Sequence, residues 1–220
     1  MIDSISAQCM DKQLLLLPGR KDFSSPRERR ILKRTGDILI TLLLLPLALP
    51  LILICALAIK LDSRGPVFFI QERLGLAGAP FNLIKLRTMI ENAESSGPQW
   101  CKDSDPRITR VGKILRKLRL DELPQLWNVL KNDMSIIGPR PIRRHFVDLM
   151  AQELPLYRAR LMAKPGITGW AQVHIGHANT MEDHIRMLQY DLFYLSHQSL
   201  CLDLQILLKT VPTVLRGKGR

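Results

Sequence analysis

The sequence is poor in aromatic residues and has no paired cysteines. It contains 3 Trp, 3 Tyr and 6 Phe, which offers few rings for base stacking and disfavours a nucleic-acid-binding module. Cys9, Cys55, Cys101 and Cys201 are widely spaced and form no C-x-x-C pair, which indicates neither a zinc site nor a disulfide framework. There is no internal repeat and no low-complexity tract. The apolar run Leu14–Leu17 is too short for the core of a secretory signal.

Acidic residues are outnumbered by basic ones. Among 220 residues there are 32 Lys and Arg against 20 Asp and Glu, for a net charge of +12 and a pI of about 10.0. A large positive excess implies an anionic partner. Because the chain also has a long apolar segment, anionic lipid headgroups and phosphate-bearing substrates rank above nucleic acid.

That segment, Ile38–Ile59, carries no charge and is interrupted by Pro46 and Pro50. As a straight helix rising about 1.5 Å per residue, it would cross a hydrocarbon core of about 30 Å. Each proline lacks an amide donor, so the sequence predicts a kink or break around Pro46, Leu49 and Pro50, with two arms too short to span. Hydropathy alone leaves two interpretations open: a spanning anchor or a re-entrant helix.

Charge next to this segment favours the re-entrant interpretation. The preceding flank, Arg20–Arg34, is rich in Arg and Lys, which keeps it cytoplasmic under the positive-inside rule. A spanning helix would then export a strongly basic domain with unpaired cysteines. We therefore expect both flanks on the same, cytoplasmic side of the membrane.

The pattern predicts an α+β fold, a mostly helical cytoplasmic domain with a small β-hairpin. We divide the chain into a polar and basic leader (1–32), a proline-broken re-entrant membrane helix (33–60) and a catalytic domain (61–220) large enough for a single core. Expected strands cover Val67–Ile70 and Phe81–Leu86, and residues 88–106 form a loop after one short helix. Apolar periodicity predicts helices at 108–118, 125–130, 145–161, 181–195 and 200–215, the last as an amphipathic interfacial helix.

Asp121 and Glu122 follow a basic helix that carries Arg116 and Arg119. Adjacent helical residues point in different directions, so the two carboxylates would divide two tasks. One attacks or accepts a proton while the other helps to hold Mg²⁺, which proteins bind through one or two carboxylates plus substrate phosphates. The alternative is structural: Asp121 caps the helix that begins near Pro124.

Other basic side chains are candidates for phosphate binding. Arg140 lies between two prolines in the segment Gly138–Pro141, which fixes a planar five-donor fork suited to a diphosphate. The alternative is a rigid turn whose arginine faces water. Lys85 and Arg87, on or after the second strand, add positive charge, although charges on an exposed strand edge also have this pattern.

Two further groups of residues have less specific interpretations. Trp170 ends the loop Lys164–Trp170 and would stack on a base or lie at the membrane surface. His174, His177 and His184 lack metal-ligand spacing, so we expect surface histidines.

Taken together, these motifs resemble the bacterial sugar transferases, the monotopic polyprenyl-phosphate phosphoglycosyl transferases. The resemblance runs in order from Lys33 to Lys209. It rests on Lys33-Arg34 with Asp37, the proline-interrupted segment, Lys60–Phe69, Gln71-Glu72-Arg73, Asp105–Gly112, Leu120–Gln125, Gly138–Pro141 and Lys164–Gly169.

The resemblance implies an enzyme that moves a sugar-1-phosphate from a UDP-sugar to undecaprenyl phosphate and releases UMP. It implies a catalytic domain on the cytoplasmic face of the bacterial inner membrane, Asp121 as a nucleophile that forms a covalent phosphosugar, and Mg²⁺ held with Glu122. Family arginines that bind phosphate correspond to Arg116 and Arg140. The sugar, the glycan pathway and the oligomeric state are not implied.

The chain departs from the family pattern in two places. Many members have Ser before the helix-breaking proline where this chain has Leu49, and Gln172–Gly176 replaces a common Gln-Val-Asn-Gly. Without the multi-span N-terminal region of larger members, the chain resembles the minimal catalytic form. A membrane-bound basic adaptor without activity is the competing hypothesis, and a nucleic-acid-binding module is a third.

Overall fold

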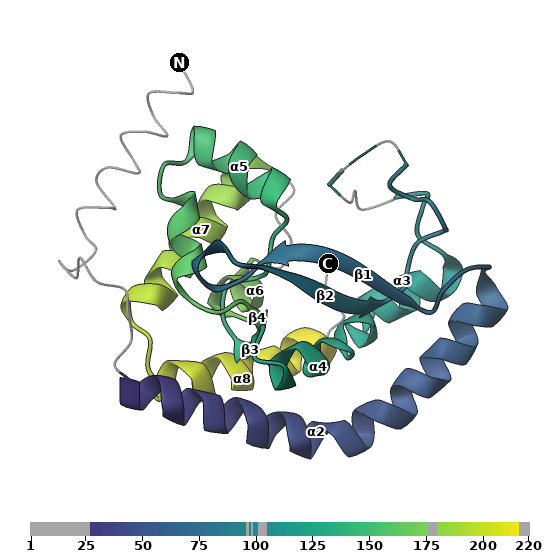
Figure 1. The fold of residues 1–220 in the computed structure, drawn as a ribbon, viewed down its shortest axis with the longest axis horizontal. Helices are drawn as coiled ribbons and strands as arrows, with labels where there is room; N and C mark the ends of the chain where they lie inside the picture. Colours follow the sequence, from purple (N-terminus) through teal and green to yellow (C-terminus); the bar gives the residue numbers. More distant parts are fainter. Residues whose placement is uncertain (1–26, 96, 98, 101–104, 176–179, 216–220) are drawn as a thin grey trace.

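The computed structural model describes residues 27–95, 97, 99–100, 105–175 and 180–215 (Figure 1). Most of the expected leader therefore lies outside the described residues, and its last six residues begin the first helix. In chain order the elements are α2 (Arg27–Asp62), β1 (Phe68–Leu74), the 3₁₀ helix η1 (Leu76–Gly78), β2 (Pro80–Leu86), α3 (Arg110–Lys117), η2 (Leu120–Glu122), α4 (Gln125–Leu130), β3 (Ser135–Ile137), α5 (Arg144–Glu153), η3 (Tyr157–Met162), β4 (Gly166–Thr168), α6 (Trp170–His174), α7 (Met181–Ser196) and α8 (Leu200–Leu215).

The apolar segment forms one continuous helix, so of the kink or break expected at the prolines the break does not occur. α2 runs for 36 residues through Pro46 and Pro50, and Figure 1 shows it curved around the rest of the molecule. A proline removes one backbone donor and bends a helix without having to end it. Leu49, at the expected break, is 55 % exposed. The Thr41 hydroxyl donates to the Asp37 carbonyl, one turn earlier in the helix.

The predicted hairpin is confirmed and is longer than expected. β1 and β2 pair antiparallel, with Phe69 opposite Lys85 and Arg73 opposite Phe81. Because side chains alternate along a strand, Phe69, Gln71, Arg73 and Lys85 share one face. This face forms part of the wall of the candidate site.

A second, parallel pair of strands was not predicted. β3 pairs with β4, with Ser135 opposite Gly166, and β4 lies within the stretch Lys164–Trp170 that was expected to be a loop. The backbones approach closely: a Cβ on Gly138 would lie 2.2 Å from the Lys164 carbonyl oxygen. Glycine therefore permits this contact, which anchors the segment that carries Arg140.

Two helical predictions need correction. The segment expected as one helix over 145–161 is α5 followed by η3, because Leu154 precedes Pro155 and takes extended backbone. Among the described residues of 88–106 no helix forms; residues 91–95 make a turn. The other predicted helices, α3, α4, α7 and α8, are confirmed within a few residues.

Three clusters of buried apolar side chains hold the elements together. One joins α2, β2, α4, β3, α7 and α8 through residues that include Ala48, Val129 and Ile206. A second joins α5, η3 and α7. The third packs Cys55 and Ile59 near the end of α2 against Leu86 and Leu115.

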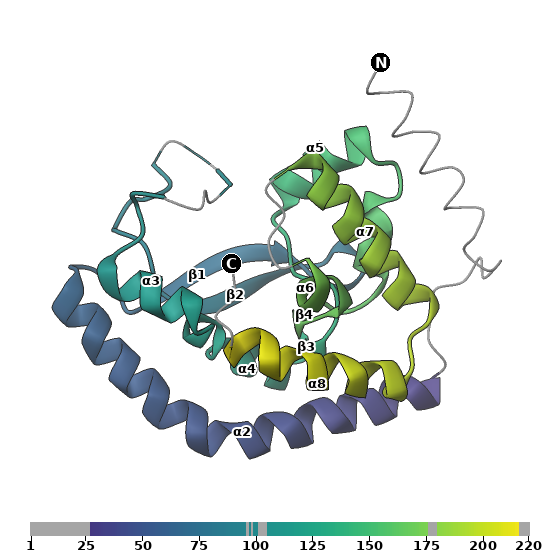
Figure 2. The same cartoon turned by 180° about the vertical axis from the view of Figure 1, so that it is seen from behind.

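Both ends of α2 are bound to the same domain. Near the first end, Asp37 Oδ1 accepts hydrogen bonds of 3.0 Å from Ser135 Oγ and from the Ile136 amide, and Lys33 pairs with Asp203 of α8 at 2.8 Å. At the other end, Asp62 Oδ2 accepts from the Val111 amide at 3.0 Å. Figures 1 and 2 show α8 beside the first half of α2.

Much of α2 between these anchors is apolar and exposed. Leu43 is 79 % exposed, Leu47 66 % and Leu53 70 %. By length and composition, α2 is the one helix among the described residues that would be able to cross a membrane. Such an area of exposed leucine is typical of a surface that binds a membrane or another protein.

Candidate active site

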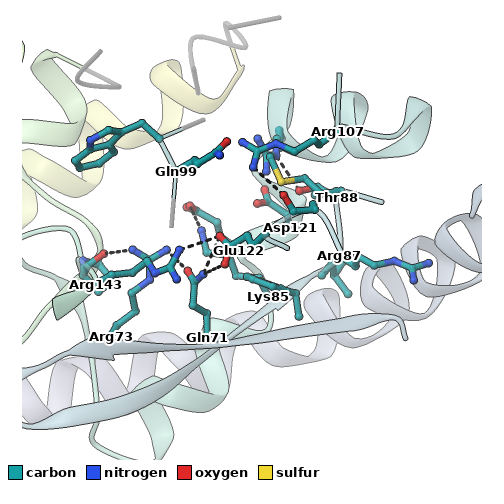
Figure 3. Close-up of a pocket in the computed structure, with 18 of the residues that line it drawn as sticks. Gln71, Arg73, Lys85, Arg87, Thr88, Gln99, Arg107, Asp121, Glu122 and Arg143 are labelled. Carbon is teal, nitrogen blue, oxygen red and sulfur yellow. Dashed lines mark hydrogen bonds and ion pairs between the residues drawn. The ribbon is translucent and has the colours of Figure 1, made fainter. Parts of the chain in front are cut away.

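The sequence-predicted carboxylates and all five predicted cations line one cavity of about 730 Å³. Figure 3 shows this cavity above the hairpin. Its wall includes Lys85, Arg116, Arg119, Asp121, Glu122 and Arg140. Residues separated by up to 55 positions in the sequence, Lys85 and Arg140, thus face the same space.

The turn between α3 and η2 directs the two carboxylates into the cavity. α3 ends at Lys117, and Arg119 then takes left-handed backbone with a φ of 56°. A non-glycine residue in this region is uncommon and is found where the surrounding fold demands it. The reversal places Asp121 and Glu122 on a short 3₁₀ turn in which both are buried.

Asp121 does not cap the next helix, so the structural alternative is wrong. The N-cap of α4 is Pro124, and no side chain donates or accepts at that cap. Within the described part of the chain, the Asp121 carboxylate forms no ion pair. It is a buried carboxylate that lines the cavity.

Glu122 is held by three cations. Arg140 Nη2 lies 2.8 Å from Glu122 Oε1, Lys85 Nζ 3.2 Å from the same atom, and Arg119 Nη1 3.4 Å from Oε2. Burial alone would raise the pKa of Glu122, but these three cations outweigh it and hold the pKa well below its ordinary value. Glu122 is therefore a fixed negative charge at neutral pH.

The pKa of Asp121 is shifted in the opposite direction to that of Glu122. Burial raises the pKa of the Asp121 carboxyl above its ordinary value, and the charge of Glu122 adds to the rise. Lys85, Arg116 and Arg140 oppose this rise. Two adjacent carboxyls thus differ in pKa, an arrangement that lets them divide two tasks.

Arg140 is presented by the parallel strand pair and supported from behind. The Gly138 amide donates to the Thr168 carbonyl at 2.9 Å, and the buried Arg160 donates to the Arg140 carbonyl at 3.4 Å. Arg160 is itself paired with the buried Asp191 of α7 at 2.6 Å. Arg140 faces the cavity rather than open water, so the alternative of a water-facing turn is wrong.

The remaining predicted cations divide into two groups. Arg116 donates from Nε to Thr88 Oγ1 at 2.8 Å on the cavity wall, and Lys85 is paired with Glu122 rather than exposed on a strand edge. Arg87 has different contacts. Its guanidinium binds the Ser63 and Arg64 carbonyl oxygens after α2, and Figure 3 shows it turned away from Asp121. Arg87 therefore also lines the cavity, but its guanidinium fixes the loop after α2 rather than contacting the two carboxylates.

The histidine and tryptophan expectations have mixed outcomes. His174 is exposed, as expected, and His177 lies outside the described residues. His184 is 6 % exposed and lines the cavity, which corrects the expectation of a surface histidine. Trp170 packs against His174 and Phe193 and does not line this cavity, so the structure does not support base stacking by Trp170 at this site.

Sequence reasoning missed several residues of the cavity. Arg73 and Gln71 lie on the same strand face as Lys85 and were detectable from the two-residue period of β1. Arg143, Glu94 and Trp100 also line the cavity. Trp100 stacks on Phe146 with ring centroids 3.9 Å apart, and no local pattern indicates this contact.

Asp121 and Glu122 would supply only some of the ligands that a divalent cation needs. Among the described residues, no group of three or more His, Cys, Asp or Glu side chains is placed to hold a metal ion. Glu122 is already surrounded by cations, whereas the Asp121 carboxylate faces the cavity. One or two carboxylates with the other ligands supplied by substrate phosphate and water is the usual arrangement for Mg²⁺.

Comparison with known proteins decides the family. The model of the family described as "Bacterial sugar transferase" matches residues 28–217, which includes α2, the hairpin and the cavity. The chain belongs to the bacterial sugar transferase family. The resemblance identified from the sequence motifs is confirmed.

Curated relatives of this bacterial sugar transferase have informative names. It is similar to a UDP-N-acetylgalactosamine-undecaprenyl-phosphate N-acetylgalactosaminephosphotransferase of Aeromonas hydrophila, with 48 % identity over 86 % of this chain and 44 % of the relative. A UDP-glucose:undecaprenyl-phosphate glucose-1-phosphate transferase of Caulobacter vibrioides is 46 % identical over 83 % of this chain and 69 % of the relative. An uncharacterized sugar transferase of Bacillus subtilis, EpsL, is 42 % identical over 86 % of this chain and 90 % of the relative.

The chain spans less than half of the Aeromonas relative and about two thirds of the Caulobacter relative. The Aeromonas relative has many residues outside the matched region. The activity and substrates in these names are therefore properties of those proteins.

Proposed function

We propose that this protein is a phosphoglycosyl transferase that moves a sugar-1-phosphate from a UDP-sugar to undecaprenyl phosphate and releases UMP. The observation that carries the proposal is the division between neighbouring carboxylates. Glu122 is held by Lys85, Arg119 and Arg140, while Asp121 faces the cavity without an ion-pair partner among the described residues. Relatives named for the same reaction class support it.

Asp121 is the proposed nucleophile. One of its carboxylate oxygens bonds to the phosphorus that carries the sugar, and the bond from that phosphorus to the bridging oxygen breaks, so that UMP leaves with the electron pair. The resulting acyl phosphate passes its phosphosugar to a phosphate oxygen of the acceptor, and the Asp121 carboxylate is restored. Because the nucleophile is ionised above its pKa, the first step needs no separate strong base.

The cations around Glu122 act on charge that develops during transfer. Arg140, Lys85 and Arg119 are fixed by one carboxylate before substrate arrives, so they need little reorganisation. Arg116 adds positive charge from the α3 side of the cavity. The fixed charge of Glu122 also keeps four clustered cations from repelling one another in a buried site.

Mg²⁺ is part of the proposal. Asp121 and Glu122 would hold it together with substrate phosphate oxygens, and it would neutralise phosphate charge during transfer. Chelation is expected to abolish turnover, and Mg²⁺ added back to restore it. Turnover that persists in chelator would remove the metal from the proposal and leave the nucleophile in place.

We further propose that α2 is re-entrant and that the domain lies on the cytoplasmic face of the inner membrane. A straight helix of 36 residues would be about 54 Å long, yet both ends of this curved helix bind one domain. A helix anchored in this way does not deliver the domain to the far side of a bilayer. The arginines at its start, Arg27, Arg29 and Arg30, favour the cytoplasmic side, and exposed Leu204 and Leu208 on α8 would lie at the interface.

The test uses the purified protein in detergent with a panel of UDP-sugars and undecaprenyl phosphate. UMP release is measured for the wild type and for Asp121→Asn, with Asp148→Asn as the matched control on an exposed surface. We expect one or a few UDP-sugars to support turnover and Asp121→Asn to abolish it. No UMP release with any donor would favour a membrane-bound basic adaptor instead.

A further inference from the structure

A second group of polar side chains lies in the same cavity, next to Glu122 but separate from Asp121. It consists of Gln71 and Arg73 on β1 and Arg143 at the start of α5, gathered around Glu94. In the view of Figure 3, Gln71, Arg73 and Arg143 lie on the opposite side of Glu122 from Asp121. None of these four residues is used by the nucleophilic step.

Glu94 is bound as a substrate anion would be. Arg143 Nη1 donates to Glu94 Oε1 at 2.9 Å, and Gln71 Nε2 lies 3.2 Å from each Glu94 carboxylate oxygen. Arg73 Nη2 in turn donates to Gln71 Oε1. A carboxylate thus receives donors from two separate elements, in the way that guanidinium and amide groups receive a phosphate.

The positive charge here exceeds what Glu94 balances. Burial and the nearby guanidiniums of Arg140 and Arg143 lower the pKa of Arg73 to about 9. Its Nε is buried and has no hydrogen-bond partner among the described residues. Arg73 and Arg143 therefore carry more positive charge than Glu94 alone balances, and Arg73 has an unused donor among the described residues.

Glu94 is the partly exposed member of this group and lies on a turn. Its side chain is 34 % exposed, and it is carried by the turn at residues 91–95 rather than by a helix or strand. Arg73 and Gln71, by contrast, are fixed on a paired strand. Two of the donors are thus held by strand pairing, whereas the carboxylate that they surround is on a turn.

We propose that Gln71, Arg73 and Arg143 form a second anion subsite that binds a phosphate of the reactants, and that the Glu94 carboxylate occupies it until substrate arrives. The proposal rests on the phosphoglycosyl transferase function. That reaction requires places for phosphate oxygens other than those on the transferring phosphorus: the second phosphate of the donor and the phosphate of the acceptor. The shared chemistry is a phosphate monoester or diester oxygen.

The experiment compares Glu94→Gln and Arg143→Gln with the control Arg158→Gln, whose side chain is 62 % exposed. Removing the competing charge should tighten phosphate binding, so Glu94→Gln is expected to lower the KM of the substrate that uses the subsite severalfold. Arg143→Gln is expected to raise the same KM about tenfold, as for loss of one charge-assisted hydrogen bond. A structural support would behave differently, because both variants would then raise KM.

Two kinetic measurements distinguish whether the subsite binds a phosphate of the donor or the phosphate of the acceptor. UMP release with donor alone reports the donor, and transfer at saturating donor with varied undecaprenyl phosphate reports the acceptor. Calorimetric titration of each variant with inorganic phosphate gives a third readout that does not require turnover. Tighter phosphate binding by Glu94→Gln and weaker binding by Arg143→Gln would support the subsite even if no UDP-sugar were turned over.

The subsite is overturned if Glu94→Gln weakens phosphate binding and raises KM, or if neither variant changes either quantity while the wild type turns over normally. Melting temperatures of all variants establish that folding is retained. Failure of the subsite is thus distinguished from failure of the proposed function, which is judged by wild-type UMP release.

Discussion

Arg140 Nη2 donates a hydrogen bond of 2.8 Å to Glu122 Oε1. The two residues come from separate motifs, the Asp-Glu pair and the Gly-Pro-Arg-Pro segment, and their contact brings both motifs to one cavity. It raises the pKa of Arg140 and lowers that of Glu122. This contact is the reason that we propose the next carboxylate in the cavity, Asp121, as the nucleophile.

The pH dependence of the first half-reaction should report the raised pKa of Asp121. The nucleophile is active when deprotonated, so UMP release with donor alone is expected to fall as the pH drops through a pKa above the ordinary aspartate value. Using donor alone avoids titration of the acceptor phosphate, whose second pKa is about 6. Lys85 lowers the pKa of Asp121, and Lys85→Gln should therefore move the acid limb to higher pH. A limb that is unmoved, or moved downward, would contradict the assignment.

Glu122→Gln should retain the fold and lose most of the activity. The amide keeps the shape of the side chain but removes the charge that holds Lys85, Arg119 and Arg140 in place. We expect kcat to fall by about 10²–10³, the range for loss of a preorganised electrostatic contact. Glu153→Gln, at the exposed end of α5, is the matched control. Near-normal turnover of Glu122→Gln would show that the cations are positioned by other means.

The ion pair between Arg160 and Asp191 should be important for stability. Both side chains are 2 % exposed, so Asp191→Asn leaves a buried guanidinium without its counter-charge and should cost about 3–5 kcal/mol. Asp148→Asn breaks an exposed pair, with side chains 62 % and 45 % exposed, and should cost about 0–1 kcal/mol. Thermal unfolding in detergent compares them. Equal small effects would mean that Arg160 finds another partner.

The two ends of α2 should be labelled from the same side of the membrane. In a chain without its native cysteines, Arg30→Cys and Arg64→Cys place thiols at exposed positions on either side of the apolar segment. A membrane-impermeant maleimide should reach both from the cytoplasmic side only. Leu47→Cys, on the exposed apolar surface, should resist labelling from either side because lipid covers it. Labelling of Arg64→Cys from the periplasm would establish a spanning helix.

Local periodicity predicted the elements that have a single strong pattern. The apolar stripe of α3, the short α4 and the long α7 and α8 follow helical spacing, and the hairpin follows β alternation across a glycine-containing loop. By contrast, β3 and β4 have three residues each and pair across a long stretch of chain. Their pairing is set by the tertiary contact at Gly138, which no local pattern encodes.

The sequence predicted those site residues that belong to a distinctive motif. Asp121 and Glu122 are adjacent carboxylates after a basic helix, and Arg140 lies between two prolines; the structure brings these residues together. Arg87 also lines the cavity, but its guanidinium binds the carbonyl oxygens of Ser63 and Arg64 in the loop after α2. Arg143 and Glu94 are 49 positions apart in the sequence and are joined by a hydrogen bond. No local sequence pattern predicts this contact. The prolines of α2 bend the helix without ending it, since packing at both ends holds it together.

The most direct measurement incubates the purified enzyme with a UDP-sugar radiolabelled in the phosphate that carries the sugar, with no acceptor present, followed by quenching and peptide mapping. We predict stoichiometric UMP release and label on the peptide that contains Asp121, and loss of that label when undecaprenyl phosphate is added. Product formation under the same conditions without label on Asp121 would contradict the account.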